Sequence, residues 1–341
     1  MTKLFLIRHA EAEGNVFRRL HGQYNSTVTP NGMRQIEALR RRFESIPIDA
    51  VYASDLVRTC TTAGAIYKPK ALPLRKDARF REICVGAWEN IPFGELDYRD
   101  HERNFAFSHS PQSWTVEGSE PYAVYTARFL QGLEEVARRH DGQSIAIFSH
   151  GMVLRGSLSK LFFPNDNCPV KHAENTAVSL LHWENGSYCY EFINDASHIT
   201  QEISTLGKQQ WWRGAGCHDF NLRYTDAAAE NTPLLHALGI TPLPGTAVRI
   251  AYLVQEPVGA LVVRRENADC GALDFFGLLP EHRRRGLSAQ LLGEAISILR
   301  ECGCKTMRIV SEVTAPAARH LLEQYGICGN PPVFDLIPKI K

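Results

Sequence analysis

Near its N-terminus the chain reads Leu4-Phe5-Leu6-Ile7-Arg8-His9. The four apolar residues predict a strand that is buried on both faces, as the strands of parallel sheets are. Similar short apolar runs recur at residues 50–53, 145–148 and 178–181. Helical patterns separate these runs, over residues 30–43, from about residue 56, and over residues 122–139. Because strands alternate with helices, the sequence predicts an α/β layer fold with a mainly parallel sheet.

Length and composition limit the class of protein. A chain of 341 residues is long enough for about two domains. Lys and Arg number 38 against 37 Asp and Glu, so no nucleic-acid partner held by bulk positive charge is expected. No apolar run approaches the roughly 18 residues that cross a membrane, and the run after Lys3 is too short for a signal peptide. The nine cysteines include no CxxC, which favours reduced thiols over a zinc site and predicts a cytoplasmic protein.

Charged residues follow the predicted strands directly. Arg8 and His9 come after the first strand, and His150 comes after a later one. Because ligands of open α/β sheets bind beyond the carboxyl ends of the strands, we expect both histidines at the same edge. Arg58 lies in the first turn of a helix that Ser54-Asp55 can cap, and the positive end of that helix attracts anions. These positions predict a phosphate site.

The segments around these positions resemble the motifs of the histidine phosphatase (phosphoglycerate mutase-like) superfamily. In the family's order they are Leu6-Ile7-Arg8-His9-Ala10-Glu11 with Asn15, then residues 54–59, 81–89 and 149–151. The likeness covers about residues 1–203, with Ala10 where many members have Gly. It implies a three-layer α/β/α domain with a mainly parallel sheet, and a phosphatase that needs no metal.

The resemblance also implies a mechanism, and the chemistry of the residues supports it. Neutral His9 would attack phosphorus and carry the phosphoryl group as a phosphohistidine. Arg8, Arg58 and His150 would hold the non-bridging oxygens, where fixed charge lowers the barrier. Glu82 would protonate the leaving group and later activate water.

Some roles stay open at this point. Glu89 is a second carboxylate close to Glu82 in the same motif. Further substrate contacts are expected from Asn15, Gln23 and Gly151. Because the segment that continues from Glu82 looks more like the broad phosphatase branches than the glycolytic mutases, we expect hydrolysis of a small-molecule phosphomonoester. A phosphoglycerate-type mutase is the alternative.

Residues 88–121 break the rhythm of strands and helices and are rich in His, Phe, Ser, Pro and Tyr. Such a segment is expected to form a lid beside the sheet, and a lid of this kind sets substrate specificity. Residues that could serve the site or simply face solvent are Arg18, Arg19, His101 and His109. His198 is expected to be structural.

A second pattern begins after a predicted connector at residues 204–216, which contains Trp211-Trp212. Strands are expected at residues 220–224, 248–254, 258–263, 273–278 and 307–310. Helices are expected at residues 226–238, 287–300 and 315–325. The order differs from that of the first half, so the sequence predicts a different second domain over residues 217–341 rather than a duplication.

The turn between a strand and a helix near residue 283 resembles the pyrophosphate loop of GNAT-type N-acetyltransferases. Arg283 and Gly286 match its motif, and Ser288 stands where Gly or Ala is usual. Successive backbone N–H groups at such a turn can hold an anion. The resemblance implies an α+β domain with a mixed sheet that binds acetyl-CoA. The expected cofactor-binding residues are Leu279, Arg283, Arg284, Arg285, Gly286, Leu287 and Ser288.

The residues expected to catalyse acetylation of an amine depart from the pattern of the family. Leu322 stands where many relatives place a general-acid tyrosine, and Ala315 stands at an earlier asparagine position. A leucine cannot protonate a thiolate, and Tyr325 lies almost a turn further on. Two functions remain open for this half: an N-acetyltransferase, and an acyl-CoA-binding module that regulates the phosphatase without catalysis.

Overall fold

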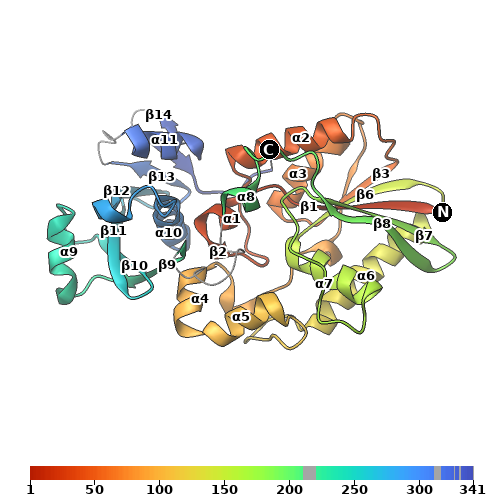
Figure 1. Ribbon diagram of the computed structural model, residues 1–341. Helices are drawn as coiled ribbons and strands as arrows, with labels where there is room; N and C mark the ends of the chain where they lie inside the picture. The colour runs from red at the N-terminus through yellow and green to blue at the C-terminus, as the bar shows by residue number, and fades with distance from the viewer. Residues whose placement is uncertain (210–219, 311–315, 326, 330–331, 341) are drawn as a thin grey trace.

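A six-stranded sheet forms the centre of the N-terminal part of the computed structural model (Figure 1). The structure describes residues 1–209, 220–310, 316–325, 327–329 and 332–340. In spatial order the strands are β4 (Leu74–Lys76), β3 (Ala50–Ala53), β6 (Ser144–Ser149), β1 (Thr2–Arg8), β7 (Val178–Glu184) and β8 (Ser187–Asp195). The first four of these run parallel, while β7 is antiparallel to β1. The prediction of a mainly parallel sheet is confirmed.

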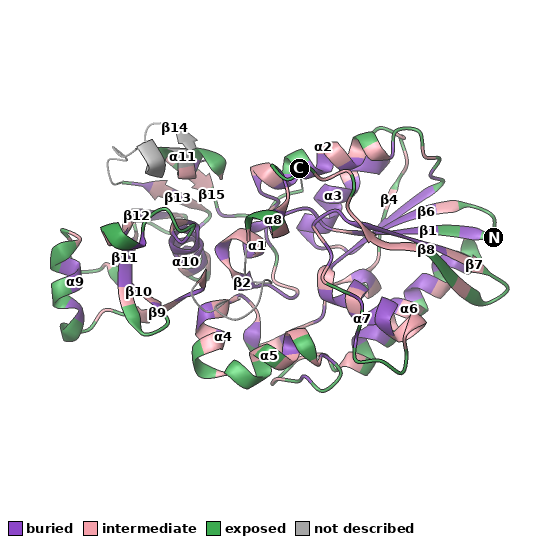
Figure 2. Cartoon of the chain, viewed as in Figure 1, coloured by how far each residue is buried: buried purple, intermediate pink, exposed green. Residues whose placement is uncertain are grey.

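Helices cover both faces of this sheet and bury its apolar side chains. On one face lie α2 (Pro30–Arg42) and α3 (Val57–Tyr67), which contribute Ile36, Leu39 and Ile66 to one core. On the other face lie α6 (Tyr122–Arg139) and α7 (Gly151–Phe162), which contribute Phe129 and Leu158 to a second core. The four inner strands of this sheet are mainly buried, whereas the edge strands β4 and β8 are half-buried or exposed (Figure 2). The result is the expected three-layer α/β/α arrangement.

Two irregular segments lie beside the carboxyl edge of the sheet. The first contains α1 (Glu13–Phe17) and β2 (Arg19–Leu20), and β2 pairs with β5 (Ile91–Pro92). The second is the predicted lid, where the weak periodicity conceals α4 (Phe93–Arg99) and α5 (His101–His109). Short 3-10 helices at Ala78–Phe80 and Gly86–Trp88 precede it.

The C-terminal part is built on a seven-stranded mixed sheet. In spatial order its strands are β14 (Cys328–Gly329), β15 (Pro332–Asp335), β13 (Thr306–Ile309), β12 (Cys270–Leu278), β11 (Glu256–Arg265), β10 (Ala247–Leu253) and β9 (Leu222–Asp226). Only β12 and β13 pair in parallel; the other neighbours are antiparallel. This agrees with the mixed sheet that the sequence predicts.

The helices of the C-terminal part differ more from expectation. A 3-10 turn (Ala229–Asn231) and the short α9 (Thr232–Ala237) replace the helix predicted at residues 226–238, because β9 extends to Asp226. A second 3-10 turn (Pro280–His282) precedes α10 (Ser288–Glu301), and α11 is Pro316–Gln324. Helix α10 packs on the second sheet and also against α1 (Figure 1).

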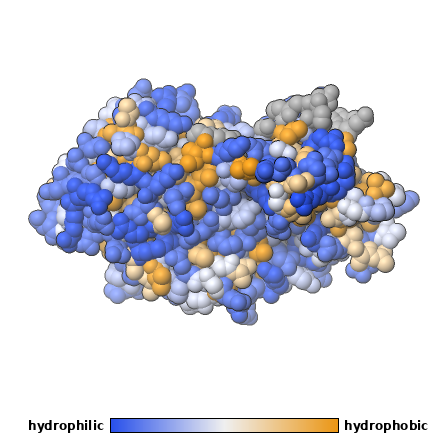
Figure 3. Space-filling view, turned by 180° about the vertical axis from the view of Figure 1, so that it is seen from behind, coloured by the Kyte–Doolittle hydropathy of each residue, from blue (hydrophilic) through white to orange (hydrophobic). Residues whose placement is uncertain are grey.

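The predicted connector begins with α8 (Thr205–Lys208), which packs on the N-terminal part through hydrogen bonds to Glu11 and Glu174. Trp211 and Trp212 lie outside the described residues. In the described part of the chain, the helices are too short or too polar to span a membrane. The face in Figure 3 is largely hydrophilic, with apolar side chains in small groups.

Candidate active site

A cavity of about 1020 Å³ lies at the carboxyl edge of the first sheet. Its wall contains six of the residues predicted for the phosphate site, namely Arg8, His9, Asn15, Arg58, Glu82 and Gly151. His150 and Gln23 do not belong to the wall. The structure therefore brings together residues that are up to 143 positions apart in the chain, from Arg8 to Gly151.

His9 is held in one orientation by the backbone around it. Its amide N–H donates to the Ser149 carbonyl, and its Nδ1 lies 2.7 Å from the Ala10 carbonyl oxygen. Because a carbonyl only accepts, Nδ1 carries the proton and Nε2 keeps its lone pair. Burial, followed by the charges of Arg58 and Arg8, lowers the pKa of His9 well below 6.5. The ring is thus neutral and held in one orientation, with Nε2 unprotonated.

Two arginines, the half-buried Arg8 and the buried Arg58, provide positive charge beside this ring. One N–H of Arg8 donates to the Ala173 carbonyl, while its Nε has no partner in the described part of the chain. Arg58 donates to the carbonyls of Gly22 and Tyr24, at 2.6 and 2.9 Å. Burial lowers the pKa of Arg58 to about 10, so the guanidinium remains charged at neutral pH. Both arginines suit an anionic ligand.

The start of α3 differs from the predicted cap. Leu56 occupies the N-cap position and makes no side-chain cap bond. Ser54 Oγ instead accepts the Leu56 N–H at 3.3 Å, and the Asp55 carboxylate pairs with Arg81. The prediction of Asp55 as a cap is therefore wrong, because the neighbouring arginine binds its carboxylate.

His150 is completely buried beneath the cavity, with its ring centroid 5.2 Å from that of His9. Its Nε2 lies 2.9 Å from Ser54 Oγ, and its Nδ1 has no partner among the described residues. Burial and the charge of Arg58 lower the pKa of His150 well below 6.5. When the Ser54 hydroxyl donates to Nε2, the proton lies on Nδ1 and is available to an anion.

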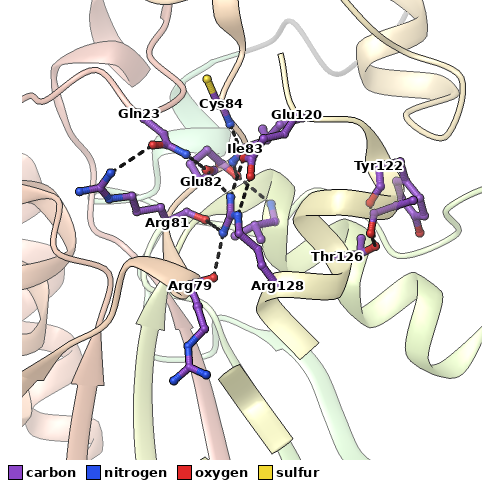
Figure 4. Close-up of polar contacts among 12 residues, drawn as sticks. Gln23, Arg79, Arg81, Glu82, Ile83, Cys84, Glu120, Tyr122, Thr126 and Arg128 are labelled. Atoms are coloured by element: carbon purple, nitrogen blue, oxygen red, sulfur yellow. Dashed lines mark hydrogen bonds and ion pairs between the residues drawn. The ribbon is translucent and has the colours of Figure 1, made fainter. Parts of the chain in front are cut away.

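The side chain of Glu82 lies against the first turn of α7. Its carboxylate oxygens accept the backbone N–H groups of Met152 and Val153, at 3.0 and 2.7 Å. Its backbone carbonyl accepts from Gln23 Nε2 at 3.0 Å and from Arg128 at 2.8 Å (Figure 4). Gln23 therefore binds the backbone of Glu82 and does not line the cavity.

Arg128 organises the loop that carries Glu82. It donates to the carbonyls of Arg79 and Arg81, each at 2.8 Å, and pairs with Glu120 at 2.7 Å (Figure 4). Sequence reasoning missed Arg128, because it occupies one of the polar positions of the amphipathic helix α6. No local signal distinguishes it from a surface arginine.

Glu89, the alternative carboxylate, does not line the cavity. Its oxygens accept the backbone N–H groups of Gln23, Tyr24 and Val85. Burial raises the pKa of Glu89. Through these contacts Glu89 holds the backbone at Gln23 and Tyr24, and the Tyr24 carbonyl in turn binds Arg58. Glu89 therefore supports this loop from outside the cavity.

Asn175 is a second residue that sequence reasoning missed. It is fully buried, lines the cavity, and donates from Nδ2 to the His9 carbonyl at 2.9 Å. Its Oδ1 has no partner within the described ranges. It lies in an irregular loop, where periodicity carries no signal.

The remaining candidates fall into three groups. Arg18, His101 and His109 line the cavity, the two histidines being exposed at its lid side. Arg19 also lines it, but is buried against Glu294 of the C-terminal part. His198 lies outside the cavity, between Arg42 and Thr176, as a structural histidine would.

The loop between β12 and α10 has the features of an anion site. Arg284 and Gly286 have positive φ angles of 63° and 76°, and a Cβ on Gly286 would meet no atom within 4 Å. Leu287 is the N-cap residue of α10, and its apolar side chain cannot accept a hydrogen bond. It therefore does not cap the backbone N–H groups of the first turn. Arg283 donates to the Leu278 carbonyl at 3.0 Å. The loop is exposed and leads into a helix start without a side-chain cap.

The end of α11 does not offer a general acid at the expected position. Leu322 is 2% exposed and packs in the core of the C-terminal part. Tyr325 packs its ring 5.3 Å from that of Phe17, and burial raises its pKa. Ala315 lies outside the described residues. In the described part of the chain no cluster of three His, Cys, Asp or Glu side chains could hold a metal ion.

Comparison with known proteins matches each part to a family. Residues 4–196 match the family model of the histidine phosphatase superfamily (branch 1), and residues 215–327 match that of the acetyltransferase (GNAT) family. Phosphoserine phosphatase 1 of Hydrogenobacter thermophilus is 28% identical over 205 residues, which cover 58% of this chain and 95% of that protein.

Two further relatives cover the same part. The metal-independent phosphoserine phosphatase of Arabidopsis thaliana is 27% identical over 204 residues, covering 59% of this chain and 84% of that protein. The solved structure of Bacillus stearothermophilus YhfR superposes with a TM-score of 0.56 at 27% identity, covering 59% of this chain and all of that one.

Proposed function

The chain belongs to the histidine phosphatase superfamily, and we propose that its N-terminal domain is a phosphomonoesterase that works through a phosphohistidine at His9. One observation carries the proposal: the neutral His9 ring, with Nε2 unprotonated, lies in one cavity with Arg8 and Arg58. Such a ring can attack phosphorus while the guanidinium groups neutralise the phosphoryl oxygens.

The reaction has two displacements. In the first, His9 Nε2 forms a bond to phosphorus while the bond from phosphorus to the ester oxygen breaks, and Glu82 gives its proton to the departing alkoxide. In the second, Glu82 takes a proton from water, which attacks the phosphohistidine and releases inorganic phosphate. Arg8, Arg58 and a Nδ1 proton of His150 stabilise the charge on the phosphoryl oxygens in both steps.

The substrate is proposed to be a small polar phosphomonoester. O-Phosphoserine is the first candidate, because two relatives that cover this domain are named phosphoserine phosphatases. The wall of the cavity adds lid residues such as His101, Phe105 and His109, which would contact the part of the substrate beyond the phosphate.

The test uses p-nitrophenyl phosphate and O-phosphoserine in the presence of a metal chelator. We expect both to release phosphate, and His9→Ala to abolish release while acid-labile phosphate on the protein disappears. Undiminished hydrolysis by His9→Ala would overturn the proposal. A mutase would instead convert 3-phosphoglycerate into its isomer, so analysis of products from that substrate separates the two functions.

We propose that the C-terminal domain binds acetyl-CoA, with the pyrophosphate on the loop of Leu279 and residues 283–288. Uncapped N–H groups at the start of α10 and the open space at Gly286 support this fit. When bound, the cofactor supplies an acyl thioester. An amine is the proposed acceptor, with binding without turnover as the second candidate, because Leu322 cannot act as an acid and Tyr325 packs against Phe17.

Calorimetry with acetyl-CoA, followed by a thiol-release assay over a panel of amines, separates these two functions. Turnover supports the acetyltransferase, binding alone supports the second candidate, and no binding overturns both. The division into residues 1–203, a connector at 204–216 and residues 217–341 is part of the proposal, as is a cytoplasmic location.

A further inference from the structure

Residues 12–25 form a segment that lies between α10 of the C-terminal domain and the phosphatase cavity. The side chains of Asn15, Arg18 and His21 in this segment line the cavity. The carbonyls of Gly22 and Tyr24 accept both hydrogen bonds that orient Arg58. The segment is therefore a wall of the site and also the support of a phosphate-binding arginine.

Helix α10 packs directly against this segment. Phe17 is 3% exposed and belongs to the core of the C-terminal domain. A Cβ on Gly293 would lie 2.4 Å from the Cβ of Phe17, so no larger residue fits at this position without a shift. The distance between α10 and α1 is thus set by a glycine that allows close approach.

Two buried ion pairs cross from α10 to the same segment. Arg19 contacts Glu294 at 2.5 Å, and the two side chains are 6% and 10% exposed. Arg300 binds both carboxylate oxygens of Glu13, at 2.7 and 3.0 Å. A charge buried to this degree is costly without its partner, so each pair favours a single arrangement of the segment.

The segment that Arg300 binds also carries the backbone that orients Arg58. Glu13, the partner of Arg300, accepts a hydrogen bond from the Thr27 hydroxyl at 2.6 Å and donates its backbone N–H to the Thr27 carbonyl at 3.1 Å. Between these two residues lies Tyr24, whose carbonyl accepts from Arg58 at 2.9 Å. Arg300 therefore fixes one end of the loop that holds the guanidinium group of Arg58.

We propose that Arg300, in the acetyltransferase-family domain, is a positioning residue of the phosphatase: through Glu13 it holds the loop whose Gly22 and Tyr24 carbonyls keep Arg58 in place to receive the phosphoryl group. The phosphatase site is then completed by the second domain. This inference rests on the proposed function of the N-terminal domain. It goes beyond that function, because Arg300 lies outside residues 4–196, which match the histidine phosphatase family, and within residues 215–327, which match the acetyltransferase family.

The experiment compares full-length variants at 25 °C. Arg300→Ala removes the ion pair with Glu13, Arg300→Lys keeps the charge without the two-pronged contact to Glu13, and Glu13→Arg/Arg300→Glu exchanges the charges. Arg223→Ala is the matched control: it removes a cation that lies 4.1 Å from the centre of the Tyr98 ring on α4, a different contact between the two domains. The measurements are the affinity for inorganic phosphate by calorimetry, kcat and KM for p-nitrophenyl phosphate, and the melting temperature.

We expect Arg300→Ala to weaken phosphate binding and lower kcat by about 10- to 100-fold, because a small displacement of Arg58 misplaces its charge. Arg300→Lys is expected to lose less, and the exchanged pair to recover part of the loss. Arg223→Ala lowers at most the melting temperature. A purely structural Arg300 would behave in the same way as this control.

Phosphate affinity and kcat within about twofold of wild type in folded Arg300→Ala would overturn the inference. If Arg300→Ala does not fold, Arg300→Lys decides by the same criterion. If the wild-type chain binds phosphate but hydrolyses nothing, the proposed function fails, while the comparison of phosphate affinities still tests the position of Arg58.

Discussion

The Nδ1 atom of His9 lies 2.7 Å from the carbonyl oxygen of Ala10, the next residue in the chain. This contact fixes the tautomer, because the carbonyl requires a proton on Nδ1 and leaves Nε2 as the only basic nitrogen. The ring is 6% exposed and lies beside two arginines. Protonation of Nε2 would add a third positive charge there, so the environment favours the neutral form, which the proposed mechanism requires.

The ionisation of His9 can be observed directly. Burial, Arg58 and Arg8 all lower its pKa well below 6.5. The neutral nucleophile therefore persists as the pH falls through 6.5, and activity is lost only below the lowered pKa. We expect the Cε1 proton of His9, assigned with a His9→Gln variant, to keep its NMR shift from about pH 8 to about pH 5. A midpoint near 6.5 would contradict a neutral, buried ring.

Glu82 is expected to matter most when the leaving group is poor. Its carboxylate lines the cavity and is oriented by the N–H groups of Met152 and Val153. Because an alkoxide needs a proton and p-nitrophenolate does not, Glu82→Gln should lower kcat for O-phosphoserine by about 100-fold more than for p-nitrophenyl phosphate.

Glu89→Gln is the control for this leaving-group effect. Glu89 binds three backbone N–H groups outside the cavity, so its replacement should lower the melting temperature and change both substrates alike. If Glu82→Gln also affects both substrates equally, the general acid is another group.

His198 links stability to pH outside the active site. Burial and Arg42 lower its pKa to about 4 in the folded chain, against 6.5 for the free side chain. The unfolded chain therefore takes up a proton near pH 6.5 while the folded chain does so only near 4, and stability falls as the pH drops between these values. We expect this group to cost roughly 1 to 2 kcal/mol at about pH 5, after allowance for its partial exposure.

Urea unfolding of the wild type and of His198→Asn at about pH 7.5 and pH 5 measures this effect. The variant loses the hydrogen bonds that His198 makes with Arg42 and Thr176 at both pH values. Its free energy of unfolding should nevertheless fall less between the two pH values than that of the wild type. An equal fall would show that the imidazole is not held neutral.

The grouping of Arg8, His9 and Arg58 could be predicted because each follows a buried strand or begins a helix at one edge of a sheet. Gln23 could not be placed in the same way. It lies in an irregular segment, and only the folded backbone decides that its amide meets the Glu82 carbonyl. Asn175 escaped prediction for the same reason, since its partner His9 is 166 residues away.

The arrangement of the two domains was beyond the reach of the sequence. Glu294 and Arg300 look like ordinary polar positions on an amphipathic helix, where such residues usually face solvent. Their partners Arg19 and Glu13 lie 275 and 287 residues away, and no periodicity relates residues at such distances. Helices α4 and α5 were missed for a local reason, because their aromatic and polar residues form no regular apolar stripe.

The loop before α10 gives a prediction for the C-terminal domain. Gly286 has a φ of +76°, and its missing Cβ would point into open space. Gly286→Ala therefore creates no clash, but it strains the backbone by about 1 kcal/mol and shifts the N–H groups that would hold a pyrophosphate. We expect acetyl-CoA to bind roughly fivefold more weakly by calorimetry, because the relaxed loop of the variant must return to the strained conformation on binding, and 1 kcal/mol corresponds to about that ratio.

Gly245→Ala is the matched control, because Gly245 has a φ of +78° and equally open surroundings on the loop before β10. It introduces the same backbone strain at a place where no anion is proposed to bind. Acetyl-CoA should bind this variant as it binds the wild type. If the two glycine variants bind the cofactor equally well, the pyrophosphate lies elsewhere, and the uncapped N-terminus of α10 is not its site.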